Sequence, residues 1–203
     1  MQINKDTKIY GSFSSNPGNN GCVFFNRKFQ ENNINAIYKS FYSDNLLKSI
    51  DAVKSLNFSG FALSMPFKIE ILNYADNIDP VANKIGSANT ILNVSNKLFA
   101  YNTDWLGVKK FLLNMSTKPS EILIAGNGGF SKAVQYTCKN ININYKIITR
   151  ENWSILETTD KLIFNATPVE LLNKNLIDGR PFSRDGKIIA NFQAEEQFKL
   201  YTK

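Results

Sequence analysis

The spacing of apolar positions along residues 1–103 alternates between the strand period and the helix period. Residues 36–41 alternate apolar and polar, which is typical of a half-buried strand. Residues 44–56 carry Leu46, Ile50 and Val53 on one helical face, with Ser43 or Asp44 as the expected cap. Strands are expected at 7–13, 36–41, up to Leu63, 90–94 and 98–102. Helices are expected at 22–32, 44–56, 66–74, 75–85 with a break near Pro80, and 103–115.

A second pattern begins after residues 116–120, which are polar, contain a proline and read as a linker. Residues 121–125 are an apolar run without alternation, as in a strand buried on both faces of a parallel sheet. Further strands are expected at 145–148 and 160–167, and an amphipathic helix near the C-terminus. Strands and helices in succession predict an α/β fold in two domains.

A glycine-rich turn separates the strand at 121–125 from the next helical segment. The run that begins at Gly126 fits G-x-G-x-x-G/A, with Ser131 in the third small position. Gly126 would make the tight turn, and Gly128 would let the backbone approach a pyrophosphate at the helix N-terminus. Strand, glycine turn, helix and second strand within about thirty residues predict a Rossmann-type domain.

The end of the next strand carries a basic residue where enzymes that use NAD carry an acidic one. Arg150 at that place would accommodate a 2′-phosphate, which favours NADP. The adjacent Glu151 makes the local charge mixed and could soften that preference. The alternative is an exposed arginine without a ligand.

The stretch from Gly60 to Lys68 offers the clearest candidate chemistry in the first half. Ser64 and Lys68 follow a short buried strand closed by Pro66, and open α/β sheets place ligands at such strand exits. The alternative for Lys68 is a lysine that extends along an apolar surface to water. Asp104, in Asn-Thr-Asp, could cap a helix or pair with Lys68.

Composition narrows the chemistry further. The chain has no histidine, which excludes Ser-His-Asp and Cys-His triads and His-ligated zinc. No metal site is expected. Its only cysteines, Cys22 and Cys138, imply no disulfide framework. The net charge of +7 favours anionic ligands, but the lysines form no basic run, so nucleic acid is not an expected partner. No membrane span or signal-peptide core is visible, and a cytoplasmic protein is expected.

Three ordered motifs together resemble those of the shikimate dehydrogenase family. That family reads Gly-x-Asn-Val-Thr-x-Pro-x-Lys, Gly-Ala-Val-Asn-Thr and Asn-Thr-Asp-x-x-Gly; here the matching stretches are 60–68, 86–90 and 102–107. The family's Gly-x-Gly-Gly turn, its Asn-Arg-Thr and its Asn-Ala-Thr also have counterparts. The C-terminal Gln-Ala-x-x-Gln-Phe begins at Gln193. The resemblance is greatest to the shikimate dehydrogenase-like subfamily, which carries an Asn-rich loop near residue 20.

The resemblance implies an N-terminal α/β substrate domain, residues 1–103 plus 186–203, and a trimmed Rossmann-type NADP-binding domain, residues 104–185. The C-terminal helix would return to the first domain, with the active site in the cleft between the domains. Lys68 and Asp104 would be the catalytic pair. The implied substrate-binding residues are Ser14, Asn20, Ser64, Asn89 and Gln193. The implied cofactor-binding residues are Gly126, Asn127, Gly128, Gly129, Phe130, Ser131, Thr149, Arg150, Asn165, Ala166 and Thr167.

Two departures from the family pattern bear on function. The family's Ser-x-Ser-Pro, which holds the substrate carboxylate, is absent, so the substrate stays open. After Asn-Ala-Thr, the family's further strand and Asp-x-x-Tyr-type motif are not visible. Residues 168–184 are expected to cap the sheet through Leu171, Leu172, Leu176 and Ile177, but to be too few to rebuild a strand–helix pair. NADPH would then bind while turnover would be slow.

The implied reaction is NADP-dependent interconversion of 3-dehydroshikimate and shikimate, within the chorismate pathway of aromatic amino acid biosynthesis. Two alternatives remain open. One is a shikimate-type ligand-binding protein with weak or no turnover. The other is a dehydrogenase for a related cyclic hydroxy acid such as quinate. The expected partner is a small-molecule substrate, and the chain is expected to be a monomer or homodimer.

Overall fold

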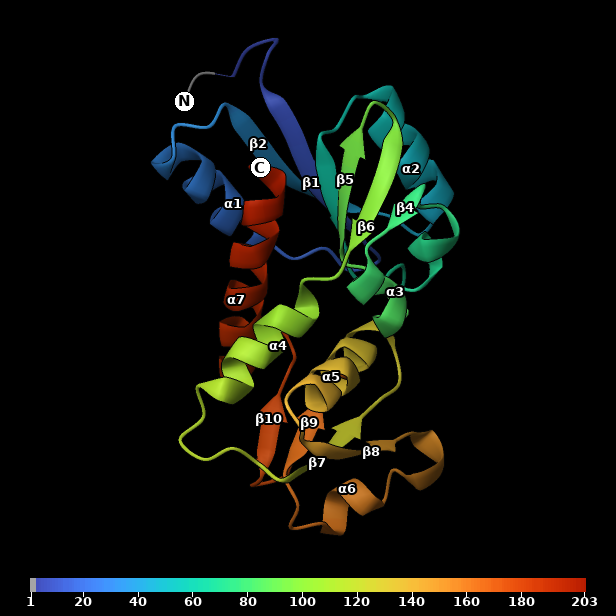
Figure 1. Ribbon diagram of the computed structural model, residues 1–203, viewed down its shortest axis with the longest axis vertical. Coiled ribbons are helices and arrows are strands. Elements are labelled where there is room, and N and C mark those ends of the chain that lie inside the picture. Colours follow the sequence, from blue (N-terminus) through green and yellow to red (C-terminus); the bar gives the residue numbers. More distant parts are fainter. Residues whose placement is uncertain (1–2) are drawn as a thin grey trace. The chain divides into compact units, whose positions relative to one another are not determined.

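The computed structural model describes residues 3–203, which form two compact units (Figure 1). Of the described residues, the first unit comprises 3–103 together with Ala194–Lys203, and the second comprises Asp104–Gln193. The division therefore falls inside the last helix, α7 (Arg184–Tyr201). The sequence had assigned everything from residue 186 to the first domain. Each unit has its own sheet and its own core.

A six-stranded mixed sheet organises the first unit, in the order β2-β1-β3-β5-β6-β4. Strand β1 pairs in parallel with β2 and β3, whereas β5 runs antiparallel to both β3 and β6. The strands are β1 (Lys8–Ser14), β2 (Ala36–Tyr42), β3 (Gly60–Leu63), β4 (Asn77–Ile78), β5 (Thr90–Val94) and β6 (Lys97–Tyr101). The helices are α1 (Asn20–Glu31), α2 (Leu46–Ser55), the 3-10 helix η1 (Glu70–Asn73) and α3 (Pro80–Ile85).

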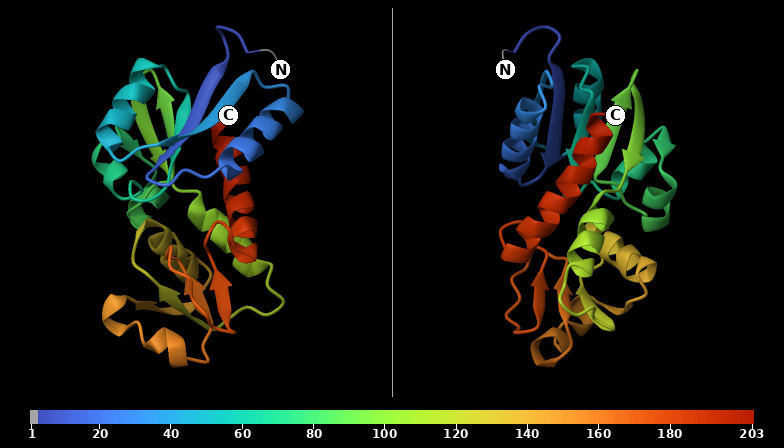
Figure 2. Two further views of the ribbon diagram at one scale, coloured as in Figure 1. Left: turned by 180° about the vertical axis from the view of Figure 1, so that it is seen from behind. Right: turned by 60° about the vertical axis from the view of Figure 1, so that its left-hand side comes forward.

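Both faces of this sheet are covered by apolar side chains. Because side chains alternate along a strand, Phe13 of β1 joins the core under α2, whereas Tyr10 joins the core under α1. The end of α7 reaches α1 in the first unit (Figure 2). There Tyr201 joins the second of these cores, with its ring against Tyr10. Gly60 of β3 leaves room for the Tyr201 ring, since a Cβ there would lie 3.0 Å from it. The C-terminal residues are thus built into the first unit.

A four-stranded, fully parallel sheet organises the second unit, in the order β10-β9-β7-β8. The strands are β7 (Glu121–Ala125), β8 (Asn144–Ile148), β9 (Ile163–Asn165) and β10 (Leu176–Asp178). The helices are α4 (Asp104–Leu113), α5 (Gly129–Asn140), the 3-10 helix η2 (Arg150–Asn152), α6 (Ile155–Thr158) and α7. Strand β7 is buried from Ile122 to Ala125, as its unbroken apolar run predicted. The predicted α/β fold with a Rossmann-type sheet is confirmed.

The segment between β3 and β5 differs from the prediction. Residues 66–74 form turns followed by η1 rather than an α-helix, and residues 75–85 form β4 and then α3. Pro80 does not break a helix but is its first residue, where its missing N–H has no partner to lose. The cap of α2 was also misassigned: the Asn45 side chain, not Ser43 or Asp44, accepts from the Lys48 N–H at 3.0 Å.

Strand β10 corrects the prediction that no further strand follows Asn-Ala-Thr. Leu176–Asp178 pairs in parallel with β9, and Ile177 is buried in the core. Leu171 and Leu176 pack against the sheet as expected, but Leu172 does not, since 92% of it is exposed. Three residues are enough to form β10, because they pair with the existing strand β9 rather than start a new sheet.

Among the helices formed by residues 3–203, none combines the length and apolar character that crossing a bilayer requires.

Candidate functional site

The polar candidates of the first unit lie along one edge of its sheet. Strands β1 and β3 end at this edge with Ser14 and Leu63, and the antiparallel strand β5 starts there with Thr90. Thr90 in turn pairs with Tyr101, the last residue of β6. The stretches that follow or precede these strand ends therefore meet, although they are far apart in sequence.

A buried hydrogen-bond network centred on Asn89 fixes this edge. The Asn89 Oδ1 accepts from the Thr103 backbone N–H at 2.7 Å and from the Thr90 hydroxyl at 3.1 Å, and its Nδ2 donates to the Thr103 Oγ1 at 3.0 Å. All three residues are buried. The Asn102 Nδ2 adds bonds to the carbonyl and hydroxyl oxygens of Ser87. Sequence reasoning placed Asn89 at the site but overlooked Thr103, although it lies inside the quoted Asn-Thr-Asp.

The loop after β3 carries Ser64 and Lys68 and is anchored at both ends. The Ser64 N–H donates to the Phe13 carbonyl at 3.2 Å, and the Lys68 carbonyl accepts from the Ala88 N–H at 2.7 Å. Between them, Phe67 is buried in the core. Ser64 is exposed and Lys68 is half-buried. The Lys68 backbone is therefore held one residue from the Asn89 network.

Ser14 and Asn20 stand at the ends of the loop that joins β1 to α1. Ser14 is buried, and its carbonyl accepts from the Ser43 N–H at 2.9 Å. Asn20 is exposed and is the first residue of α1, whose N-terminus has neither a side-chain cap nor an acidic residue in its first turn. A helix start of this kind attracts negative charge. Both residues can donate to a carboxylate.

Asp104 and Gln193 belong to the second unit. Asp104 is the buried first residue of α4, directly after the locked Thr103. Gln193 lies on α7 beside Gly107 of α4, where an added Cβ would come within 2.9 Å of the Gln193 N and Cβ atoms. Gly107 is thus required by the close approach of α4 and α7. That packing explains the glycine of the third motif.

The last rung of the parallel sheet defines the candidate cofactor edge of the second unit. Ile148, Ala125, Asn165 and Asp178 are neighbours across β8, β7, β9 and β10. The residues that follow them in sequence all leave the sheet at its carboxyl end. Open α/β sheets bind their ligands at this end.

The two key glycines of the turn have different physical reasons. Gly126 has a φ of +96°, and a Cβ there would lie 2.7 Å from the Thr167 Cγ2, so the fold itself requires glycine. Gly128 has a φ of −83°, and a Cβ would meet nothing within 4 Å. The fold does not need glycine at position 128. The open space beside it, at the start of α5, suits close approach by an anionic group.

The remaining residues of the turn mostly support it. The buried Ser131 donates its hydroxyl to the Gly126 carbonyl at 2.6 Å and so closes the turn. The Gln135 Nε2 donates to the Asn127 Oδ1 at 3.2 Å. The Phe130 ring packs against Phe164. Gly129 is the first residue of α5, and only Gly128 and Asn127 of this turn are exposed.

Thr149 and Arg150 follow β8 as predicted. Thr149 caps η2 through a reciprocal pair with Asn152, whose Oδ1 accepts from the Thr149 N–H at 2.7 Å. Arg150 is exposed, and no ion pair involving it is found among residues 3–203. Its charge is therefore available to a ligand.

The Asn-Ala-Thr segment forms a tight turn after β9. The buried Asn165 accepts at Oδ1 from the Thr167 N–H at 3.0 Å and from the Thr167 hydroxyl at 2.7 Å. The Ala166 N–H donates to the Ala125 carbonyl at 3.1 Å, which ties this turn to β7. Asn165 is thus a buried support, and Thr167 is the part of the segment that touches the glycine turn.

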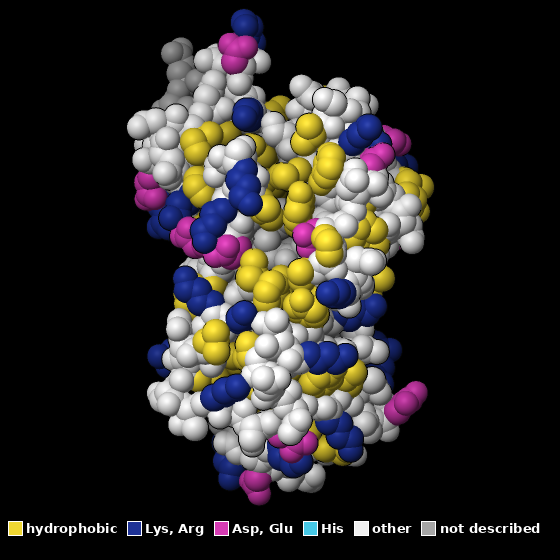
Figure 3. All heavy atoms as spheres, in the orientation of Figure 1, with side chains coloured by type: hydrophobic (Ala, Val, Ile, Leu, Met, Phe, Trp, Pro, Cys, Tyr) yellow, Lys and Arg dark blue, Asp and Glu magenta, His cyan; other side chains and the backbone are white. Residues whose placement is uncertain are grey.

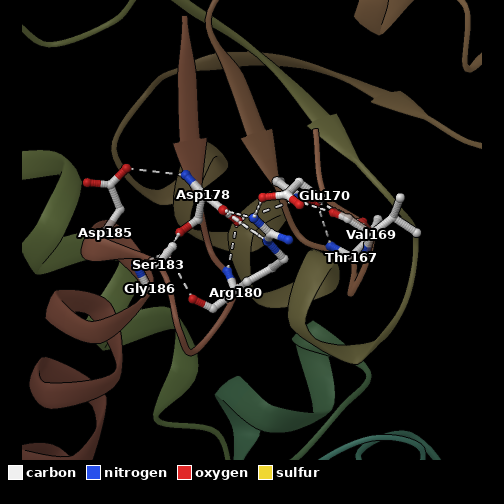
Figure 4. A network of polar contacts seen from close by, with 9 residues as sticks. Thr167, Val169, Glu170, Asp178, Arg180, Ser183, Asp185 and Gly186 are labelled. Carbon is white, nitrogen blue, oxygen red and sulfur yellow. Dashed lines mark hydrogen bonds and ion pairs between the residues drawn. The ribbon is translucent and has the colours of Figure 1, made fainter. Parts of the chain in front are cut away.

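An ion-pair network that sequence reasoning missed lies beside this turn (Figure 4). Arg180 donates from Nη2 to the Asp178 Oδ2 at 2.8 Å and to the Glu170 Oε1 at 3.1 Å. Burial alone would raise the pKa of Asp178, but the hydrogen bonds and charge of Arg180 outweigh it and lower that pKa. The same contacts raise the pKa of Arg180. Asp-x-Arg at a strand exit was the sequence feature that could have revealed it.

The surface and the acidic residues offer little other chemistry. No cluster of three or more Cys, Asp or Glu that could hold a metal ion occurs within residues 3–203. On the face drawn in Figure 3, Lys and Arg side chains are scattered among apolar and neutral ones and form no continuous basic band. The two sheet edges therefore remain the candidate sites.

Comparison with known proteins points to one family. Residues 21–91 match the model of the shikimate dehydrogenase substrate binding domain. A shikimate dehydrogenase-like protein of Haemophilus influenzae is 38% identical over 139 residues, which are 68% of this chain and 51% of that protein. A shikimate dehydrogenase (NADP(+)) of Pyrococcus furiosus is 35% identical over 143 residues, 68% of this chain and 52% of that protein. The chain spans about half the length of the curated relatives it matches.

Solved structures agree over more of the fold. The structure of a shikimate 5-dehydrogenase-like protein superposes with a TM-score of 0.77 at 29% identity, covering 99% of this chain and 93% of that one. A shikimate dehydrogenase solved in complex with NADP+ gives a TM-score of 0.80 at 26% identity, covering 99% and 92% of the two chains.

Proposed function

Because this chain belongs to the shikimate dehydrogenase family, we propose that it is an NADP-dependent oxidoreductase that interconverts 3-dehydroshikimate and shikimate. One observation carries the proposal: the stretches around Ser14, Ser64, Asn89 and Thr103 meet at a single edge of the first sheet. These stretches hold the residues that the family resemblance assigns to substrate.

The second unit fits NADP on its own geometry. The open space at Gly128, beside a start of α5 that has no side-chain cap, suits the pyrophosphate, and the exposed Arg150 suits a 2′-phosphate. Ser131 and Thr167 would shape the turn rather than contact the cofactor directly. When bound, NADPH supplies a hydride to the substrate carbonyl carbon. The protein's part is to hold both molecules and to manage the proton and the charge.

Lys68 is the proposed proton donor. As the carbonyl is reduced, its oxygen becomes an alkoxide, which needs both a proton and a nearby cation. The Lys68 ammonium can provide both, and its backbone is fixed by the bond to Ala88. Asp104 is proposed as its carboxylate partner. The Asn89 lock on Thr103 fixes the residue that precedes Asp104.

Substrate recognition would use Ser14, Asn20, Ser64, Asn89 and Gln193. Ser14 and the exposed start of α1 at Asn20 offer donors for a carboxylate, in place of the family's Ser-x-Ser-Pro. Since that motif is absent, a related cyclic hydroxy acid such as quinate is the alternative substrate. A panel of cyclic hydroxy acids with NADP+ would separate these substrates by their kcat/KM values.

A second candidate function is shikimate-type ligand binding with little or no turnover. The size of the second sheet favours it, because β10 has three residues and is the last strand on its side. Catalysis depends on positioning, and about 1 Å of misplacement costs on the order of 10²-fold. Under this function, shikimate and NADPH would bind while NADPH formation would stay at background.

The test is an absorbance assay of NADPH formation from shikimate and NADP+. We expect turnover in the wild type and a loss of about 10²–10⁴-fold in Lys68→Ala, the usual contribution of a general acid–base group. Lys84→Ala is the matched control, because Lys84 is an exposed lysine of the same unit, at the end of α3. Wild-type activity in folded Lys68→Ala would reject the role of Lys68. Shikimate binding without turnover in the wild type would favour the binding protein.

A further inference from the structure

The ion pair at the end of β10, formed by Asp178 and Arg180, includes none of the residues proposed above for catalysis, substrate binding or cofactor binding. Asp178 ends β10, and the chain turns back at once through Arg180 into α7. Both carboxylate oxygens of Asp178 accept from Arg180, at 3.1 Å from its backbone N–H, and at 2.9 Å from Nε and 2.8 Å from Nη2. The Ser183 hydroxyl donates to the Asp178 carbonyl, which closes the loop (Figure 4).

Arg180 lies at the carboxyl edge of the sheet, where an arginine could contact a phosphate. Its charge, however, is already matched by Asp178 and Glu170. A second anion would have to compete with two carboxylates, so direct phosphate binding is disfavoured. Arg150, exposed and without an ion pair, contrasts with it. The contacts of Arg180 point instead toward a positioning role.

A continuous chain of contacts leads from Arg180 to the glycine turn. Asp178 Oδ1 accepts from the Asn165 Nδ2 at 3.3 Å, and Asn165 Oδ1 in turn accepts from the backbone and hydroxyl of Thr167. The Thr167 methyl lies 2.7 Å from the place where a Cβ of Gly126 would stand. The Asn165 amide, whose Nδ2 also donates to the Val169 carbonyl at 2.8 Å, therefore helps to hold Thr167 against Gly126.

We infer that Asp178 and Arg180 are positioning residues for the cofactor: they orient Asn165, and through Thr167 they fix the glycine turn that begins at Gly126. This inference rests on the proposed NADP-dependent function. Glu170 contributes less, because 70% of its side chain is exposed.

The test compares Arg180→Ala with Lys161→Ala. Lys161 also makes an ion pair in the second unit, with Glu121, but at the amino ends of β7 and β9, away from the glycine turn. Titration of NADPH fluorescence gives the dissociation constant, and hydrogen exchange reports the Thr167 amide without any cofactor. We expect Arg180→Ala to raise the dissociation constant for NADPH about tenfold and to speed exchange at Thr167, with shikimate affinity unchanged. Lys161→Ala should change none of these.

Conservative variants separate positioning from folding. Arg180→Lys keeps the charge but loses the planar fork, so it should restore NADPH affinity only in part. Asp178→Asn keeps the shape and serves if Arg180→Ala does not fold; it too should weaken NADPH binding. If folded Arg180→Ala or Asp178→Asn binds NADPH with wild-type affinity, the positioning inference is wrong but the proposed function stands. Failure of the wild type to bind NADPH would overturn the proposed function and this inference together.

Discussion

The glycine turn allows a sharp test, because Gly126 and Gly128 should respond to alanine in opposite ways. Alanine at position 126 must adopt a φ of +96°, which costs about 1–2 kcal/mol for an L-residue. Its Cβ would also stand 2.7 Å from the Thr167 Cγ2, and overpacking of this kind costs about 1–3 kcal/mol. Reduced freedom of the unfolded chain returns about 0.4–1 kcal/mol. Gly126→Ala should therefore destabilise the second unit by about 2–4 kcal/mol.

Gly128→Ala should leave stability within about 1 kcal/mol of the wild type, since φ is −83° and nothing lies within 4 Å of the new Cβ. Under the proposed function it should nevertheless weaken NADPH binding, because the methyl group fills the approach to α5. Gly126→Ala should lower the stability of the second unit even without a ligand. Gly128→Ala should change only the affinity for NADPH.

The assay uses the positions of the two tryptophans. Trp105 and Trp153 both lie in the second unit, so tryptophan fluorescence during urea unfolding follows that unit selectively. A chain with two units need not unfold in a single step, which makes such a local reporter necessary. NADPH titration of the same samples measures binding. Wild-type stability of Gly126→Ala, or wild-type NADPH affinity of Gly128→Ala, would refute the reasoning for that glycine.

Three further predictions concern the second unit. Arg150→Ala should raise the KM for NADPH more than the KM for NADH, through loss of a charge-assisted contact; equal changes in steady-state assays would mean that Arg150 does not touch the 2′-phosphate. Ile177→Ala should cost about 2–4 kcal/mol because Ile177 is 4% exposed, whereas Leu172→Ser, at a residue 92% exposed, should be neutral in the same urea assay. The folded-state pKa of Asp178 is lowered, so its carboxylate stabilises the fold fully above the unfolded-state pKa of about 3.9, and this contribution is lost as the pH falls below that value. Asp178→Asn should therefore make the urea midpoint, followed by tryptophan fluorescence, depend less on pH in the acid range. An unchanged dependence on pH would contradict this prediction.

Local sequence patterns were sufficient to predict the elements whose structure depends mainly on residues nearby in the sequence. The apolar run at 121–125 predicted a buried strand and the glycines after it predicted a turn into a helix, and both are present as β7 and α5. The strands expected at 90–94 and 98–102 correspond to β5 and β6, which Ser95 and Asn96 connect with positive φ at both residues. The Asn-Thr-Asp and Gly-Ser-Ala-Asn-Thr motifs made Asn89 a candidate site residue, because their order and separation resemble a family pattern.

Tertiary contacts decided what local patterns left ambiguous. Residues 66–74 have helical spacing, yet the bond from Ala88 to the Lys68 carbonyl and the burial of Phe67 hold them as turns and a 3-10 helix. The short run at Leu176 has no strand length of its own and becomes β10 only because β9 offers an edge to pair with. The Asp-x-Arg at residues 178–180 could have indicated the ion pair, but only the pairing of β10 places it at the end of the sheet. The sequence by itself determined which residues are candidates for the chemistry, because that depends on residue type and order. Only the fold decided which of them support one another, because those contacts join segments distant along the chain.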